Sequence, residues 1–182
     1  DILKQISEAY RKIRNTARYI LGNTSDFDPD NKVEYKDMEE IDKWALSRLN
    51  KLVKDCTENY ENFNFHLVYH DVNQFCVTDM SNFYLDIIKD RLYTSKKDST
   101  ERRSAQTAMY IILNALVKIV APMICFTAEE IWKYMPHTKN EQVESVMLSD
   151  WPEVVAEYDN KELEEKWNHI LELKELVAKE LE

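Results

Sequence analysis

Apolar side chains recur every three or four residues along most of this 182-residue chain. Such spacing places them on one face of an α-helix, at about 100° of rotation per residue. Alternating apolar and polar runs, which mark half-buried strands, are scarce. The pattern therefore predicts an all-α protein, a bundle of four to five main helices joined by short connections. Helices are expected over residues 2–21, 40–61, 65–93, 100–120 and 160–182.

The first and last of these helices are amphipathic. Each has an apolar arc for packing and a charged opposite side. The arc of the first helix comprises Ile2, Ile6, Ala9, Tyr10, Ile13, Ala17 and Ile20, and that of the last comprises Leu163, Trp167, Ile170, Leu171, Val177 and Leu181.

Breaks in the pattern separate the first two helices. Gly22 is the only glycine in the chain. Its position predicts that it follows the end of the first helix in the left-handed conformation. Residues 24–40 hold seven acids against two lysines and are expected to form a loop. The helix over 65–93 is long enough that a bend is expected.

Further signals divide the C-terminal third. Pro122 ends the helix over 100–120, because proline cannot continue it. Thr127 and Glu130 have the spacing of a capping box for a short helix. Residues 136–154 are expected to be irregular, and Asp159 is expected to cap the last helix.

Length and composition set the domain organisation. The chain fits one helical-bundle domain over 1–158 and a C-terminal helix over 159–182 that leads toward a further region. It begins at Asp1 without Met, already in helical pattern, so we expect a piece of a longer polypeptide. One Gly and four Pro favour long helices with few breaks.

The expected location is cytoplasmic. The chain has no signal peptide and no apolar run of about 18 residues that would span a membrane. Its three cysteines are far apart and form no CxxC pair. They are expected to be small buried core residues in a reducing cytosol. These are Cys56, Cys76 and Cys125.

A basic stripe lies on the outer face of the first helix, although the whole chain has a formal net charge of −10. No acid occurs between Glu8 and Asp26. A solvated helix face normally interleaves acids with bases, whereas arginine and asparagine suit phosphate and sugar contacts. We therefore predict nucleic-acid contacts here, with an ordinary solvated face as the alternative. The stripe consists of Lys4, Arg11, Arg14, Asn15 and Arg18.

A second basic cluster spans 89–103, where six basic residues face three acids. Tyr93 lies among the cations, and an aromatic ring there can stack on an unpaired base. The alternative is an ordinary basic turn in which Arg102 and Arg103 pair with acids of the helices. The candidate residues are Lys89, Arg91, Tyr93, Arg102 and Arg103.

No pattern predicts a catalytic or metal site. A Gly-rich phosphate loop is impossible with one glycine, and no nucleophile motif is present. His66 and His70 lie four residues apart but lack a third ligand, so they are expected to be ordinary helix residues. Asp79 and Asp90 are expected to form structural ion pairs near the apolar side of their helix, with Arg91 or a neighbouring helix. The four tryptophans, Trp44, Trp132, Trp151 and Trp167, are expected to be core or packing residues rather than a stacking platform.

Four segments together resemble a known family. They are YRKIRNTARYILGN (10–23), FYLDIIKDRLY (83–93), APMICFTAEEIW (121–132) and LSDWPE (148–153). In this order they resemble the tRNA anticodon-binding domain of bacterial isoleucyl-tRNA synthetase, a class I aminoacyl-tRNA synthetase. The related valyl, leucyl and methionyl enzymes share the helical bundle, and the first two segments resemble the isoleucyl branch most.

The resemblance implies a bundle that grips the anticodon stem and loop of tRNA(Ile). It gives the anticodon side to Lys89 and Arg91. It gives the stem role to residues of the first helix, namely Arg11, Lys12, Arg14, Asn15 and Arg18. Tyr93, Arg102 and Arg103 join the site on the charge argument alone. The implied partners are tRNA(Ile) and the catalytic domain and C-terminal region of the parent chain, with no membrane and no DNA.

The resemblance also implies binding without chemistry. The HIGH and KMSKS segments of the catalytic domain and the cysteine motifs of the zinc-bearing region are absent from the sequence. The fragment is therefore expected to have no catalytic residues and no cofactor. The parent, an isoleucine–tRNA ligase, is expected to use ATP, magnesium and a zinc held elsewhere.

Two other readings stay open. The acidic helix over 160–182 suits a helical protein–protein interaction module, and the bundle suits the equivalent domain of a valyl- or leucyl-tRNA synthetase. Basic patches on one continuous face would favour RNA, whereas scattered basic residues would favour the protein module. A bundle metalloenzyme would need inward Glu-x-x-His pairs, which the sequence lacks.

Overall fold

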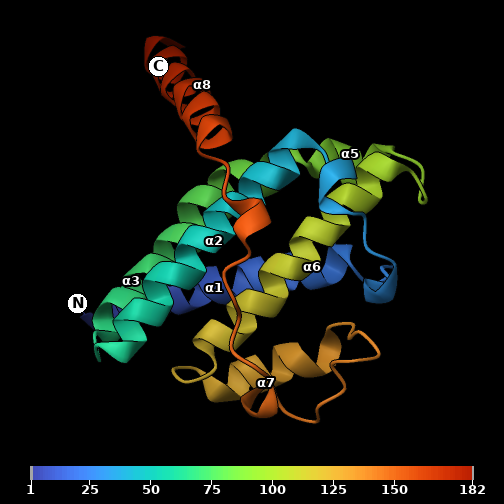
Figure 1. Cartoon of the computed structure of the whole chain (residues 1–182). Helices are drawn as coiled ribbons and strands as arrows, with labels where there is room; N and C mark the ends of the chain where they lie inside the picture. Colours follow the sequence, from blue (N-terminus) through green and yellow to red (C-terminus); the bar gives the residue numbers. More distant parts are fainter. Residues whose placement is uncertain (1, 182) are drawn as a thin grey trace.

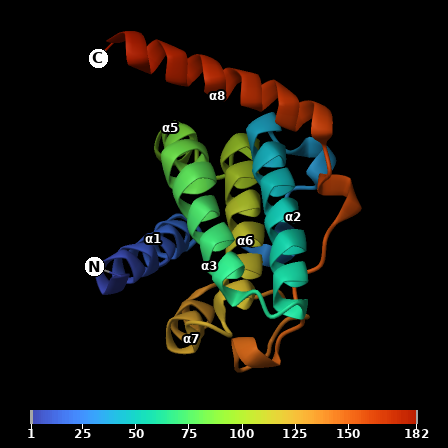
Figure 2. The same ribbon diagram turned by 90° about the vertical axis from the view of Figure 1, so that its left-hand side faces the viewer.

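Three helical segments run side by side through the middle of the molecule (Figures 1 and 2). They are α2 (Glu40–Glu61), α6 (Thr100–Val120), and α3 (Phe65–Gln74) with its continuation. The structure is a computed structural model that describes the backbone of residues 2–181, and side chains apart from those of residues 2, 174, 175 and 178–181. The described residues include no strand, so the predicted all-α bundle is confirmed. Ile2 and Leu181, expected on apolar arcs, lie outside the described side chains.

Helix α1 (Ile2–Asn23) crosses this layer and packs against α3, α6 and α7 (Cys125–Tyr134). Its predicted apolar arc faces the core, because Ala9, Ile13, Ala17 and Ile20 are buried. Ile6 is 50% exposed, so the arc packs only from about the second turn onward. The opposite face of α1 is left to solvent.

The end of α1 differs from the prediction. Gly22 lies inside the helix, and its φ is not positive. The last carbonyls are instead capped by side chains one and two residues further on. Asn23 Nδ2 donates to the Tyr19 carbonyl at 2.8 Å, and Thr24 Oγ1 donates to the Ile20 carbonyl at 2.9 Å. These two bonds satisfy acceptors that a left-handed glycine would otherwise serve.

The helix expected over 65–93 is divided in the structure. After α3 the chain continues as a π-helix (Phe75–Tyr84), a short α4 (Leu85–Ile87) and α5 (Lys89–Thr94). The wide turns of a π-helix shift the register of the apolar face. In this register Met80, Phe83 and Tyr84 are all buried. The single helix expected here is thus a series of segments in which the helix type changes.

A buried carboxylate joins the helices at one end of the bundle. Asp42 is fully buried near the start of α2. It accepts hydrogen bonds from Tyr84 Oη at 2.7 Å and Ser104 Oγ at 2.5 Å. Arg91 of α5 donates to both carboxylate oxygens at 2.9 Å. Four separate segments thus share one charge, which is paired and hydrogen-bonded as a buried charge requires.

The chain after α7 returns along the bundle as an irregular strap that leads to α8 (Lys161–Leu181), as Figure 2 shows. Asn50 of α2 holds the strap, donating to the Val155 carbonyl at 2.7 Å and to Asp159 Oδ1 at 2.8 Å. The predicted Asp159 cap is therefore wrong, because that carboxylate is turned to Asn50. Asn160 Oδ1 accepts from the backbone N–H of Leu163 at 3.0 Å in its place.

Helix α7 starts earlier than its predicted capping box. It begins at Cys125, and the residue before it, Ile124, makes no side-chain cap. The Thr127 hydroxyl lies 2.9 Å from Tyr10 Oη, so it joins α7 to α1. Glu130 consequently has no role as a capping-box partner.

Two cysteines behave as predicted and one does not. Cys56 and Cys76 are buried, and burial raises the pKa of each thiol to about 12. Cys125 is exposed, so the expectation of a third core cysteine is wrong. The reason is its place at the first turn of a short surface helix.

The tryptophans are core or packing residues, as predicted, and Trp151 packs edge-on against Tyr60 outside the core. Trp44 and Trp132 are fully buried, and Trp167 is partly buried against the core. Trp151 is 37% exposed, so it is not a core residue. Its indole N–H donates to Thr57 Oγ1 at 2.8 Å, which fastens the strap to α2.

Replacing Gly22 tests its helical conformation. A methyl group added there would meet no atom within 4 Å. Gly22→Ala is expected to raise the free energy of unfolding by about 0.5–1 kcal/mol, because alanine loses less backbone entropy in a helix. Urea unfolding followed by circular dichroism measures the change. A loss of stability would indicate the left-handed conformation instead.

Replacing Asp42 tests the shared buried charge. Asp42→Asn is expected to lower the free energy of unfolding by about 3 kcal/mol, because the Arg91 guanidinium loses its partner in a mostly buried site. Asp55→Asn is the matched control, since Asp55 pairs with Lys51 at 2.7 Å on the surface. The control is expected to cost less than about 1 kcal/mol. Equal costs in urea unfolding would contradict the assignment.

Candidate nucleic-acid interface

The stripe predicted on α1 is a solvent-facing row of side chains without internal partners. All five members are exposed. Among the residues that the structure describes, none of their side chains forms a hydrogen bond or an ion pair. Their positive charges are therefore available to a ligand from outside. The members are Lys4, Arg11, Arg14, Asn15 and Arg18. Lys12, which joins the candidate site through the resemblance, is likewise exposed and unpaired among the described residues.

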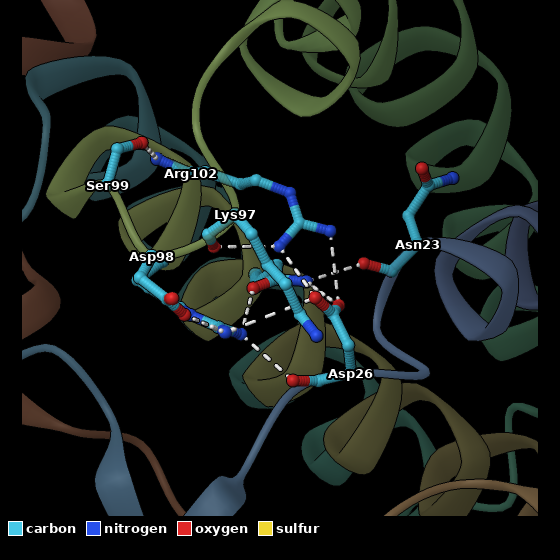
Figure 3. Close-up of polar contacts among 8 residues, drawn as sticks. Asn23, Asp26, Lys97, Asp98, Ser99 and Arg102 are labelled. Atoms are coloured by element: carbon cyan, nitrogen blue, oxygen red, sulfur yellow. Dashed lines mark hydrogen bonds and ion pairs between the residues drawn. The ribbon is translucent and has the colours of Figure 1, made fainter.

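The second basic cluster behaves differently, because an acidic loop neutralises it. Asp26 accepts hydrogen bonds from the two terminal nitrogens of Arg102 at 2.9 and 3.1 Å (Figure 3). Arg103 donates to Asp98 Oδ1 at 2.9 Å and to the Asp26 carbonyl at 3.0 Å. Gln106 Nε2 also donates to Asp26 Oδ1, at 2.7 Å. The structure therefore supports the alternative of an ordinary basic turn in which Arg102 and Arg103 are paired. The acids that pair with them come from loops, whereas helix acids were expected.

These contacts lower the pKa of Asp26, the acid at their centre. The Arg102 guanidinium, through its hydrogen bonds, lowers the pKa of Asp26 from an ordinary 3.8 to about 2, although partial burial opposes the shift. The ion pair therefore holds the loop after α1 against the start of α6. Asn23, whose carbonyl accepts from Gln106 Nε2 at 2.9 Å, ties the end of α1 to the same network.

Arg91 and Lys89 are also engaged. Arg91 is bound to the buried Asp42, and its guanidinium additionally donates to the Glu101 carbonyl at 3.2 Å. Lys89 pairs with Asp86 at 2.8 Å, but this pair is half exposed and easily exchanged for another anion. A role in RNA contact stays a prediction for all the cations of this cluster, and Arg91 has the least freedom to fulfil it.

Tyr93 is the member of the second cluster that lies beside the stripe. Its ring is 69% exposed. Its hydroxyl is close enough to Tyr19 of α1 to contribute, after burial, to raising the pKa of Tyr19 to about 12. The structure thus places an exposed aromatic ring from α5 next to the C-terminal half of α1, where the cations are unpaired.

A groove on the other side of the stripe was not predicted. It lies between α1 and α7 and has a volume of about 210 Å³. Sequence reasoning missed it because its two walls are more than 100 residues apart and meet only in the folded chain, for example at the Tyr10–Thr127 contact. Tyr134 of α7, 68% exposed, stands at this groove. The lining residues are Arg14, Arg18, Leu21, Thr127, Glu130, Ile131 and Tyr134.

The remaining titratable candidates are structural or exposed. Asp79 pairs with Arg48 of α2 at 3.2 Å, which confirms the expected ion pair with a neighbouring helix. Burial raises the pKa of Asp79 despite that partner. Asp90 is exposed, so its expected place near the apolar side is wrong. His66 and His70 are exposed on α3.

Neither a metal-binding cluster nor a membrane-spanning helix is found among the described residues. No three His, Cys, Asp or Glu side chains gather there in an arrangement that could hold a metal ion. Of the helices covered by those residues, none combines the length and hydropathy that crossing a membrane requires.

The exposed cationic helix agrees with the relationship to known proteins. The family model described as "Anticodon-binding domain of tRNA ligase" matches residues 42–180. The chain belongs to this family. The match begins in α2, so α1 and its stripe precede the segment that defines the family.

Curated relatives align with α1 as well. Isoleucine–tRNA ligases of Caldanaerobacter subterraneus subsp. tengcongensis and Caldicellulosiruptor saccharolyticus are 55% and 57% identical to the chain. That of Desulforamulus reducens is 54% identical. Each alignment covers 100% of this chain and 20% of the relative. The chain thus spans about a fifth of the length of these ligases, and the resemblance to the isoleucyl branch is confirmed.

The Asp26 network gives a pH-dependent prediction. Asp26→Asn is expected to lower the free energy of unfolding by about 2 kcal/mol at pH 7, since each pKa unit corresponds to about 1.4 kcal/mol. The folded-state pKa is lowered, so this contribution is complete above about pH 5 and is lost as the pH falls toward 2. The stability difference between the variant and the original chain should therefore shrink between pH 5 and pH 2 in urea unfolding.

Asp150→Asn is the control for this experiment. Asp150 is an exposed acid with no partner among the described residues. Its replacement is expected to leave stability unchanged at both ends of the pH range. A stability difference for Asp26→Asn that stays constant with pH would contradict the ion-pair account.

Proposed function

We propose that this chain binds the anticodon stem-loop of tRNA(Ile) and positions it for the remainder of an isoleucine–tRNA ligase. The observation that carries the proposal is the stripe on α1, a row of cations with no internal partner in a protein of net charge −10. Family membership supports it, since the family is described as binding anticodons.

The physical basis is electrostatic positioning. Guanidinium groups fork onto phosphate oxygens, and such contacts fix the register of an RNA without reading its sequence. Arg11, Arg14 and Arg18 lie three to four residues apart, so they extend along one helix face over about two turns. That length suits the backbone of a stem better than a small anion.

Recognition of individual bases would come from the aromatic residue beside the stripe, Tyr93 of α5. Sequence-specific RNA recognition targets splayed bases that stack on aromatic rings. Tyr93 is exposed beside the cations and is the residue of the second cluster placed for this role. Lys89, in an exposed and exchangeable pair, can add a phosphate contact next to it.

A second binding role is favoured by α8. Leu173, Leu176 and Val177 are 57–61% exposed along its outer half. Its first half is docked, because Leu163 is buried and Lys166 pairs with Glu40 at 2.7 Å. We propose that the exposed half contacts the C-terminal region of the parent chain. Aminoacylation, with ATP, magnesium and zinc, would belong to regions outside this chain.

A titration at two salt concentrations tests tRNA binding. The chain is titrated with a labelled tRNA(Ile) anticodon stem-loop. If about four phosphates of the double-stranded stem are neutralised, affinity is expected to fall roughly 150-fold between about 50 and 200 mM salt. The double variant Arg14→Glu/Arg18→Glu should bind at least about tenfold more weakly and with a flatter salt dependence.

The control reverses charge elsewhere. Lys54→Glu/Lys161→Glu changes the net charge by the same amount at exposed lysines outside α1. It is expected to retain most of the affinity. In the full-length ligase, the arginine variant should raise the KM for tRNA and leave adenylate formation intact. The proposal fails if no binding occurs at low salt and the arginine variant changes nothing in the ligase.

A further inference from the structure

The groove between α1 and α7 contains an acid where a phosphate site should have none. Arg14 and Arg18 form one wall with unpaired guanidinium groups. Glu130 of α7 lines the opposite wall. Among the described residues, the Glu130 carboxylate has neither a hydrogen bond nor an ion pair, although two arginines line the same groove.

The neighbours of Glu130 show that its position is specific. The preceding acid, Glu129, accepts a hydrogen bond from Ser145 Oγ at 2.5 Å and lies outside the groove lining. Thr127 and Tyr134 are three residues before and four residues after Glu130, so all three occupy one face of α7. That face is held against α1 by the contact between Thr127 and Tyr10.

A carboxylate there repels phosphate and accepts hydrogen bonds only. In an RNA strand, each phosphate alternates with a ribose that carries a 2′-hydroxyl donor. The 2′-hydroxyl is the group by which a protein distinguishes RNA from DNA at a given site. A groove with two cations on one wall and one acceptor on the other matches this alternation of anion and donor.

We propose that the α1–α7 groove is a ribose-reading subsite for one RNA strand. This inference rests on the proposed RNA binding and adds to it the residue that selects ribose. Arg14 and Arg18 hold consecutive phosphates, and Glu130 accepts the hydrogen bond of the intervening 2′-hydroxyl. The exposed Tyr134 ring covers the sugar at the end of the groove.

The test compares two RNAs that differ only at the 2′ position. One is the unmodified anticodon stem-loop, and the other carries 2′-fluoro groups throughout the stem, which keep the A-form shape and the phosphates but remove the donor. The original chain is expected to bind the unmodified RNA about tenfold more tightly, the usual effect of a hydrogen bond to a charged group.

The Glu130→Ala variant tests the carboxylate, because it removes the proposed acceptor of the 2′-hydroxyl hydrogen bond. It is expected to bind both RNAs with nearly equal affinity, and to bind the fluorinated RNA at least as tightly as the original chain does, because a negative charge has left a phosphate site. Glu130→Gln keeps an acceptor oxygen without the charge and should retain an intermediate preference of about threefold. Glu162→Ala, which removes an exposed acid on α8 at the other end of the molecule, should keep the full preference.

The outcomes separate the two proposals. Salt-dependent binding with no preference for the unmodified RNA, or a preference that survives in Glu130→Ala, would overturn the ribose-reading subsite and leave RNA binding by the stripe standing. Absence of binding to either RNA at low salt would overturn the subsite, and it would overturn RNA binding as well if Arg14→Glu/Arg18→Glu changes nothing in the ligase. Loss of preference in Glu130→Ala alone, with unchanged salt dependence, is the result that supports the subsite.

Discussion

The buried charge of Asp42 is the contact on which the arrangement of the bundle depends. Its carboxylate is shared by α2, the π-helix, α5 and α6 through Tyr84, Arg91 and Ser104. A buried carboxylate without partners would be costly, so these segments can pack only when all of their donors reach it. The hydrogen bonds to Asp42 therefore fix the position of α5, and with it the position of Tyr93 beside α1.

The pairing of basic side chains with acids within the protein then decides which surface is free to bind. The chain has acids to neutralise the 89–103 cluster, and it places them in the loop after α1 and in the turn before α6, at Asp26 and Asp98. Among the described residues, no acid pairs with the cations on the outer face of α1, and Glu130 of α7 only lines the groove beside Arg14 and Arg18. A net charge of −10 is consequently compatible with a positive local field at α1. The reason is that the arginines of the 89–103 cluster are paired with acids of the protein, whereas the cations on the outer face of α1 are not.

Periodicity predicted the elements well because most helices here are amphipathic or buried. Helices α2 and α6 have the predicted bounds, and the free cations of α1 followed from an angular projection. The end of α1 was missed because two side-chain caps, from Asn23 and Thr24, replaced the glycine. The expectation that a left-handed glycine ends a helix takes no account of such side-chain hydrogen bonds.

The site was harder to predict than the fold because its parts are distant in sequence. Whether Arg102 is free depends on Asp26, 76 residues away, and a charge count of the 89–103 segment alone cannot include it. Likewise the groove beside Arg14 exists only because α7 packs on α1. Local sequence gives which residues are charged, but tertiary contact decides which of those charges remain available.

The distribution of acids also limits how a polyanion can approach. The loop over 24–40 has a net charge of −5, and most charges along α8 are acidic. In Figure 2, α8 lies across one end of the molecule and α7 at the other, with α1 on the side between them. Beyond about 10 Å at ordinary salt these repulsions are screened, so they act only on RNA that is close to the wrong surface. Under the proposed RNA binding, the acidic body would therefore contribute little to affinity and would instead confine a bound RNA to α1 and its two flanking aromatic residues, Tyr93 and Tyr134.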